Sequence, residues 1–177
     1  PWSPLLSNLT RSARLSPDGR FRHALGRTWT PAGPQIAFIG LNPSVADADV
    51  DDPTCRRCVR FAQDSGFGRL VMVNLFAFRA TRPAELWASG PAQSSDEDDV
   101  LAQILGSVDR VVACWGAVPQ ATDRARQVLA IAAAHAQPVY VLGLSKHGHP
   151  RHPLYLPASA RPQPWAAPGQ VPSPYAT

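Results

Sequence analysis

The sequence predicts a three-layer α/β/α domain with a mostly parallel, four-stranded central sheet. Its 177 residues suit one domain, because a chain of that length buries roughly 70% of its unfolded surface. Four short and continuous apolar runs are typical of strands that are buried on both faces. Helical segments separate these runs, and strands that alternate with helices in this way form a parallel sheet.

The elements follow from these patterns. The four buried strands are expected at residues 35–40, 70–76, 111–115 and 139–143. The segment 21–29 follows an Asp18-Gly19 turn and is expected to form an edge strand.

Helices are expected between the strands. The first begins at Asp52-Pro53, an acidic N-cap followed by proline in the first turn, and ends at Gly66. Short helical turns are expected at 83–88. Ser95 is predicted to cap the next helix, and the last helix spans about 119–135.

Three segments make up the predicted organisation. Residues 1–17 form an N-terminal arm, residues 18–157 a single α/β domain, and residues 158–177 a proline-rich tail. Six prolines occur in residues 157–177 without an apolar period, so this tail is expected to wrap the surface or to be disordered.

Composition excludes several classes of protein. No run of 18 apolar residues is present, so no membrane-spanning helix and no membrane partner are expected. Three cysteines are too few for a disulfide scaffold and indicate a reducing compartment, so we expect a cytoplasmic protein. The net charge of +4 is uneven: residues 1–82 contain 11 Arg and 6 Asp, whereas residues 83–146 contain 4 bases and 7 acids. This asymmetry suits a polyanionic partner.

Two polar loops follow the first and the last of the four buried strands. They span residues 40–52 and 145–155, and both contain proline and several titratable side chains. Because sites in parallel sheets form where loops leave the carboxyl ends of strands, we expect these two loops to converge.

The chain resembles a known bacterial and phage family at these loops. The segments FIGLNPSVADADVDDPTCRRC, NLFAFRAT, CWG and PRHPLYL are similar to the family catalogued as domain of unknown function 1643, over about residues 20–157. Their layout is also similar to the uracil-DNA glycosylase superfamily, in which a Gly-x-Asn-Pro-Gly loop follows the first strand and a His-Pro-Ser loop follows the last. Ser44 replaces the final glycine of the first loop here, and His152-Pro153-Leu154 or His149-Pro150-Arg151 matches the second in part.

The second resemblance implies a cleft that binds a nucleobase. Cleavage of an N-glycosidic bond places negative charge on the departing base and positive charge on the sugar. Asn42 is then expected to orient water at the sugar carbon, and His152 to donate a hydrogen bond to the base anion. The expected substrate-binding residues are Gly40, Leu41, Pro43, Ser44, Asp51, Asn74, Phe78, Arg79, Trp115, His149 and Arg151.

Other motifs have structural alternatives. Cys55 and Cys58 share the apolar face of a helix, which predicts buried thiols rather than redox or zinc chemistry. The four aspartates of residues 47–52 suit either a divalent cation or a solvated loop with a helix cap. Three histidines in 147–152 have no evident fourth zinc ligand. We therefore expect no bound metal and no cofactor.

The sequence leaves three functions open. The first is a glycosylase-like protein that binds a nucleobase in DNA or a nucleotide and hydrolyses its N-glycosidic bond. The second is a non-catalytic module that binds nucleic acid or nucleotide, and the third is a metal-dependent enzyme that uses the aspartates of residues 47–52. DNA or a nucleotide is the expected partner, and no obligate protein partner is evident.

Overall fold

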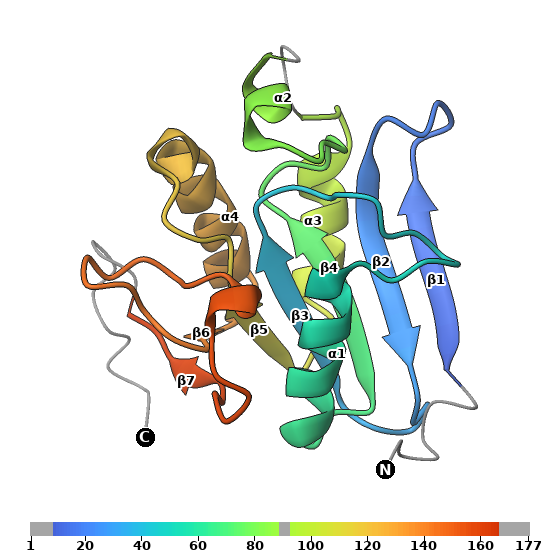
Figure 1. Ribbon diagram of the computed structural model, residues 1–177, viewed down its shortest axis with the longest axis vertical. Helices are drawn as coiled ribbons and strands as arrows, with labels where there is room; N and C mark the ends of the chain where they lie inside the picture. Colours follow the sequence, from blue (N-terminus) through green and yellow to red (C-terminus); the bar gives the residue numbers. More distant parts are fainter. Residues whose placement is uncertain (1–8, 89–92, 167–177) are drawn as a thin grey trace.

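The fold is built on one mixed sheet of seven strands, seen in a computed structural model that describes residues 9–88 and 93–166 (Figure 1). The strand order is β1-β2-β4-β3-β5-β6-β7. The strands are β1 Thr10–Leu15, β2 Arg22–Thr28, β3 Gln35–Gly40, β4 Arg69–Asn74, β5 Arg110–Ala113, β6 Val139–Val141 and β7 Gln163–Pro164. The helices are α1 Pro53–Asp64, α2 Pro83–Ala88, α3 Glu97–Leu105 and α4 Thr122–Ala134, with short 3-10 turns η2 Pro119–Ala121 and η3 Pro153–Tyr155.

The sheet corrects the prediction of a mostly parallel sheet with four strands. The four expected strands, β4, β3, β5 and β6, do pair in parallel. However, β1, β2 and β7 extend this group with antiparallel pairs. Most β1 residues are exposed, so its sequence lacks the apolar pattern of a strand. The expected edge strand β2 lies inside the sheet, between β1 and β4.

Helices cover the two faces of the sheet. Successive residues of a strand point to opposite faces, so a continuous apolar strand supplies both layers of core. In β3, Ile36 and Phe38 pack with α1, whereas Ala37 and Ile39 belong to the core under α3 and α4. Figure 1 shows α1 in front of the sheet, with α3 and α4 behind it.

Helix α1 starts as the sequence predicts. Asp52 is the N-cap and accepts a hydrogen bond from the backbone N–H of Cys55 at 2.7 Å, and Pro53 occupies the first turn. Cys55 and Cys58 are fully buried, which confirms the prediction of buried thiols.

Two elements differ from the expected boundaries. Helix α3 has Asp96 rather than Ser95 at its N-cap. The proline-rich tail returns to the sheet, because β7 pairs with β6 and the backbone N–H of Trp165 donates to Val139. Residues 1–8 of the expected arm and 167–177 of the expected tail lie outside the described residues. Within the described part, no helix is long and apolar enough to cross a membrane.

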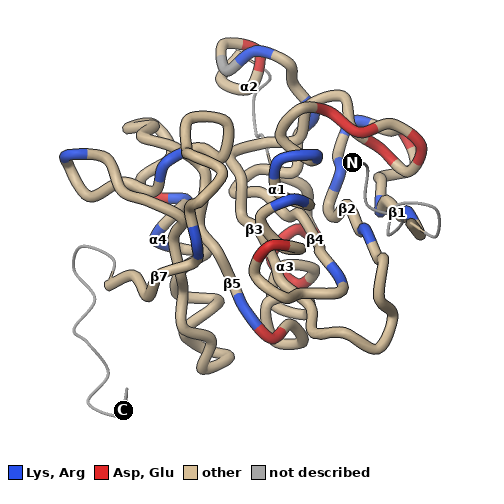
Figure 2. Tube along the Cα trace, turned by 60° about the horizontal axis from the view of Figure 1, so that its bottom comes forward, with Lys and Arg blue, Asp and Glu red and all other residues tan. Residues whose placement is uncertain are grey.

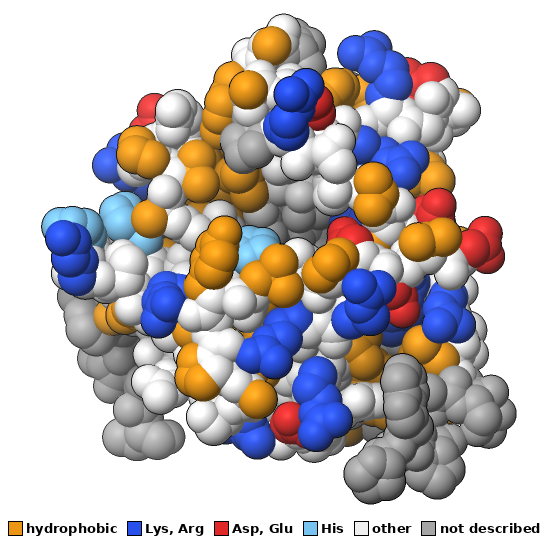
Figure 3. All heavy atoms as spheres, viewed as in Figure 1, with side chains coloured by type: hydrophobic (Ala, Val, Ile, Leu, Met, Phe, Trp, Pro, Cys, Tyr) orange, Lys and Arg blue, Asp and Glu red, His pale blue; other side chains and the backbone are white. Residues whose placement is uncertain are grey.

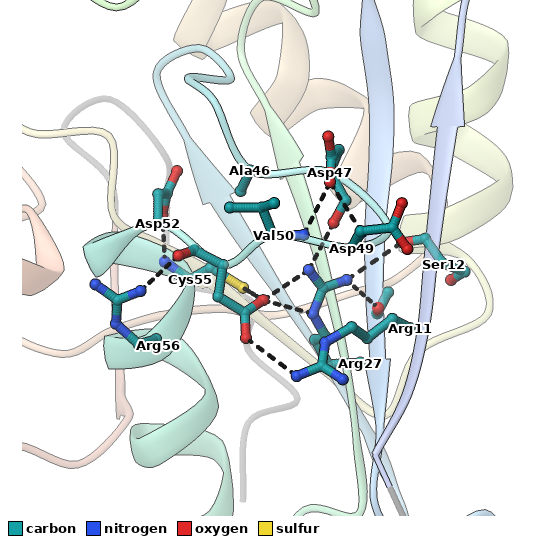
Figure 4. Close-up of polar contacts among 12 residues, drawn as sticks. Arg11, Ser12, Arg27, Ala46, Asp47, Asp49, Val50, Asp52, Cys55 and Arg56 are labelled. Carbon is teal, nitrogen blue, oxygen red and sulfur yellow. Dashed lines mark hydrogen bonds and ion pairs between the residues drawn. The ribbon is translucent and has the colours of Figure 1, made fainter.

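A buried arginine on β2 holds the loop that precedes α1. Arg27 is completely buried, and its Nε and Nη2 contact Oδ1 of Asp51 at 2.8 and 2.7 Å (Figure 4). Its Nη2 also donates to the carbonyl of Asp47 at 2.7 Å, and neighbouring Arg22 donates to the carbonyl of Ala46. These contacts tie the loop to β2, and Figure 2 shows its acidic positions beside β1 and β2.

A second buried ion pair joins α3 to α4. Glu97 and Arg124 are 3% and 4% exposed, and their charged atoms lie 3.7 Å apart. Nε of Arg124 also donates to the carbonyl of Leu75, just after β4, at 2.6 Å. Burial raises the pKa of Glu97 to about 7, although Arg124 opposes this change.

Arg27→Met should lower the free energy of unfolding by about 3 to 5 kcal/mol, because it leaves the partly buried Asp51 carboxylate without its main partner. Arg11→Met is the control. Arg11 is 40% exposed and lies 3.8 Å from the same carboxylate, so its loss should cost less than about 1 kcal/mol. Urea denaturation measures both changes, and equal losses would contradict this role of Arg27.

Glu97→Gln should flatten the pH dependence of stability. Because its pKa is raised on folding, Glu97 stabilises the fold below pH 4.5, and this contribution is lost as the pH rises through about 7. Relative to the wild type, the variant should therefore gain stability between pH 5 and 8. Glu85→Gln is a control for which the opposite change in stability is expected. Because the Arg82 side chain lowers the pKa of Glu85, this variant should lose stability relative to the wild type as the pH rises. An unchanged pH profile for Glu97→Gln would contradict the raised pKa.

Candidate functional site

The strand order creates a crevice at the carboxyl edge of the sheet. Strand β3 lies between β4 and β5, and its connection runs through α1 on one face. The connections after β4 and β5 run through α3 and α4 on the other face. Loops that diverge in this way leave room for a ligand between the strand ends. Figure 3 shows the surface hollowed at this edge, between α2 and α1.

Gly40 and Asn74 lie next to each other at this edge of the sheet. They end β3 and β4 and pair in register. A Cβ atom at Gly40 would lie 2.7 Å from Oδ1 of Asn74, so glycine makes room for that side chain. Asn74 is 6% exposed, and its buried Nδ2 has no hydrogen-bond partner within the described part of the chain. An unpaired buried donor costs about 1–3 kcal/mol. A ligand with an acceptor would remove this cost.

Asn42 is fixed by its amide nitrogen. Its Nδ2 donates to the carbonyls of Ala80 and Pro43, at 2.8 and 3.0 Å. The backbone N–H of Ala80 also donates to Pro43, at 3.0 Å. The loop after β3 is thereby joined to the segment after β4. With the nitrogen held in this way, the carbonyl oxygen Oδ1 is the group that Asn42 can present as an acceptor.

His152 is a neutral donor at the start of η3. Its Nδ1 accepts a hydrogen bond from the backbone N–H of Leu154 at 3.3 Å, so the proton of the neutral ring resides on Nε2. Partial burial lowers the pKa of His152, although the carboxylate of Asp52 opposes this change. Helix α1, which follows the first loop, packs against η3 of the second loop, and Nη2 of Arg57 donates to the carbonyl of Leu156, so the second loop lies beside the helix that the first loop leads into.

Several predicted substrate-binding residues already have partners inside the protein. Asp51 contacts Arg27, and the Arg79 Nη1 donates to the carbonyl of Gly19 at 3.3 Å. Nη2 of Arg151 donates to the carbonyl of Tyr155 at 2.7 Å, although Arg151 itself is exposed. The remaining members are Pro43, which is buried, Leu41 and Ser44, which are half-buried, and Phe78, which packs edge-to-face with Phe21.

Trp115 and His149 line a separate pocket of about 140 Å³ on the α4 side of the sheet. Trp115 packs edge-to-face with Trp165, with their ring centres 5.8 Å apart. Leu70 and Met72 face α1, and Asn74 follows them in the alternation of β4, so its side chain is also on the α1 face. The pocket on the α4 side and the crevice at Asn74 therefore lie on opposite faces of the sheet. The structure therefore divides the predicted site residues between two places.

Sequence reasoning missed three residues that shape this region. Arg22 and Arg27 hold the first loop, but an arginine in a strand usually indicates an exposed position. Trp165 lines the α4-side pocket from within the proline-rich tail. The sequence marks Trp165 only as a large aromatic residue within a segment of mostly small and polar residues.

The cysteine thiols are buried, whereas two histidines of the second polar loop are exposed. Burial raises the pKa of Cys55 to about 12, and a hydrogen bond with Cys114, together with burial, raises the pKa of Cys58. These groups stay protonated and therefore unreactive. His147 and His149 are exposed. Among residues 9–88 and 93–166, no three His, Cys, Asp or Glu side chains lie close enough to hold a metal ion.

Comparison with known proteins identifies the family. A family model described as a protein of unknown function (DUF1643) matches residues 22–154, which include β2 to β6, the first polar loop and all but the last residue of the second. No curated protein and no solved structure matches the chain. The match covers well over half of the sequence, so the chain belongs to the DUF1643 family.

Proposed function

We propose that the crevice between β3, β4 and β5 binds a nucleobase, carried by DNA or by a nucleotide, and that the protein hydrolyses its N-glycosidic bond. The observation that carries this proposal is the buried, unpaired Nδ2 of Asn74 beside Gly40. A buried donor of this kind is rare in a native fold and calls for a partner.

A nucleobase offers the acceptor that Asn74 lacks. Ring nitrogens and exocyclic oxygens of bases accept hydrogen bonds in the plane of the ring, and asparagine is a common reader of base edges. An edge-on base would satisfy Nδ2 without a charged partner.

Asn42 and His152 supply complementary groups for hydrolysis. The Oδ1 of Asn42 would accept a hydrogen bond from water and orient it toward the sugar, while Ala80 and Pro43 hold the amide in place. The neutral Nε2–H of His152 would donate to the base as negative charge develops on it. Preorganised donors and acceptors of this kind act without a metal ion or a covalent intermediate. The similarity of the two loops to those of uracil-DNA glycosylases supports the same assignment.

Asn74→Leu should separate a binding role from a structural one. Leucine has a similar shape but no donor, so the free energy of unfolding should stay constant or rise by about 1–3 kcal/mol. Binding of the base should weaken at least tenfold, because one hydrogen bond is lost. Thermal unfolding and a titration with nucleosides and nucleotides measure the two effects. A marked loss of stability would show instead that Asn74 serves the fold alone.

His152→Ala should slow base release by about a hundredfold and leave affinity nearly unchanged, because the donor acts mainly on the transition state. His149→Ala is the matched control, since His149 is exposed on the same loop and lines the other pocket. Chromatography detects the released base from a panel of deaminated and modified bases, in single- and double-stranded DNA and in nucleotides. Binding without release across this panel would favour a non-catalytic module and contradict the hydrolysis.

A further inference from the structure

The α1 face of the protein carries an excess of arginine. Helix α1 contains three arginines and one acid, Asp64, and the segment 151–161 packed beside it contains two arginines and no acid. We call these five side chains the α1-face arginines: Arg56, Arg57, Arg60, Arg151 and Arg161. Figure 3 shows basic side chains spread across this face, below the hollow at the carboxyl edge.

Most of these arginines keep their charge uncompensated. Arg56 and Arg57 donate to the carbonyls of Asp51 and Leu156, and Arg151 and Arg161 also donate to backbone carbonyls. A carbonyl fixes the guanidinium in place without neutralising it. Only Arg60 has an acidic partner, the exposed Asp64 at 3.1 Å.

The opposite face has the reverse balance. Helix α3 contains Glu97, Asp98 and Asp99 and no base. Helix α4 contains two arginines, and both pair with acids: Arg124 with Glu97 and Asp98, and Arg126 with Asp123. Apart from the four aspartates of residues 47–52 at the start of α1, the sheet separates an arginine-rich face from an acidic one, and a polyanion is attracted to the arginines.

An aromatic ring stands among the α1-face arginines. Tyr155 is 73% exposed, and its ring centre lies 5.7 Å from that of His152. The carbonyl of Tyr155 holds Arg151. Exposed aromatic rings beside fixed cations suit unstacked bases, which stack on the ring while their phosphates meet the cations. In a single strand, one ligand uses both groups, because its base stacks on the ring and its phosphates meet the cations.

We propose that the α1 face binds single-stranded nucleic acid, with its phosphates on the α1-face arginines and one base stacked on Tyr155, next to the crevice. This inference rests on the proposed function and deepens it, because it assigns a polymer rather than a free nucleotide as the substrate. The base that enters the crevice is then a neighbour of the base on Tyr155.

The test is the salt dependence of binding by the full chain. The probe is a fluorescein-labelled single strand of about 20 nucleotides, longer than the usual contact of one domain. Each phosphate contact contributes about 0.7 to the slope of log K against log salt. Arg56→Ala and Arg151→Ala should each lower this slope by about 0.7. Arg126→Ala, an exposed arginine on the opposite face, should leave it unchanged.

Tyr155 provides a second measurement. Tyr155→Leu should weaken single-strand binding about tenfold, whereas Tyr155→Phe should restore it, since stacking needs only the ring. The same variants should bind the matching duplex equally, because its bases are already stacked. Melting temperatures confirm that each variant is folded.

The outcomes separate this inference from the proposed function. Strand binding with the expected slopes but without base release would support the inference and contradict hydrolysis. Base release from a free nucleotide, without salt-sensitive strand binding, would support hydrolysis and contradict the inference. Three results would overturn the inference. The first is an equal salt slope for Arg56→Ala and the wild type, and the second is tighter binding to the duplex than to the single strand. The third is a preference for anionic phosphatidylserine vesicles over the single strand.

Discussion

The contact between Arg27 and Asp51 is the constraint on which the candidate site depends. Arg27 sits on β2, and its guanidinium fixes the end of a long loop that starts at β3 and leads into α1. Asp52, the next residue, caps α1 and lies close enough to His152 to act on its pKa. Burial of this ion pair costs desolvation energy, so its benefit lies in position rather than in stability alone.

This dependence explains why the antiparallel strands matter. The parallel strands β4, β3 and β5 produce the divergence of loops that opens the crevice. They offer no support for a loop of twelve residues, which would otherwise move in solvent. The hairpin of β1 and β2 extends the sheet under that loop and supplies Arg22 and Arg27 as anchors. The parallel strands therefore create the site, and the hairpin holds one of its walls.

The predictable and unpredictable parts of this structure differ in physical origin. Strand β3 was predictable because both of its faces are buried, which requires an unbroken apolar run. Strand β1 is exposed and exists through its pairing with β2, and pairing leaves no mark on a single sequence. Asn42 and His152 were singled out by their place in loops that follow strands and by the resemblance of these loops to those of uracil-DNA glycosylases, and their role stays a prediction. The role of Arg27 needed the structure, because a buried arginine differs from an exposed one only by its partner.

The proposed site and the arginine-rich face use opposite kinds of polar group. Asn42, Asn74 and neutral His152 are uncharged, and two of them are fixed by backbone contacts before any ligand arrives. Uncharged polar groups cost less to bury than charged ones, so they suit contact with a base in the crevice. The arginines remain at the surface, where their charge stays hydrated until phosphates replace water. If both proposals hold, attraction at the face and discrimination in the crevice are independent: the charge of the face would set affinity for a strand, and Asn74 would set the choice of base.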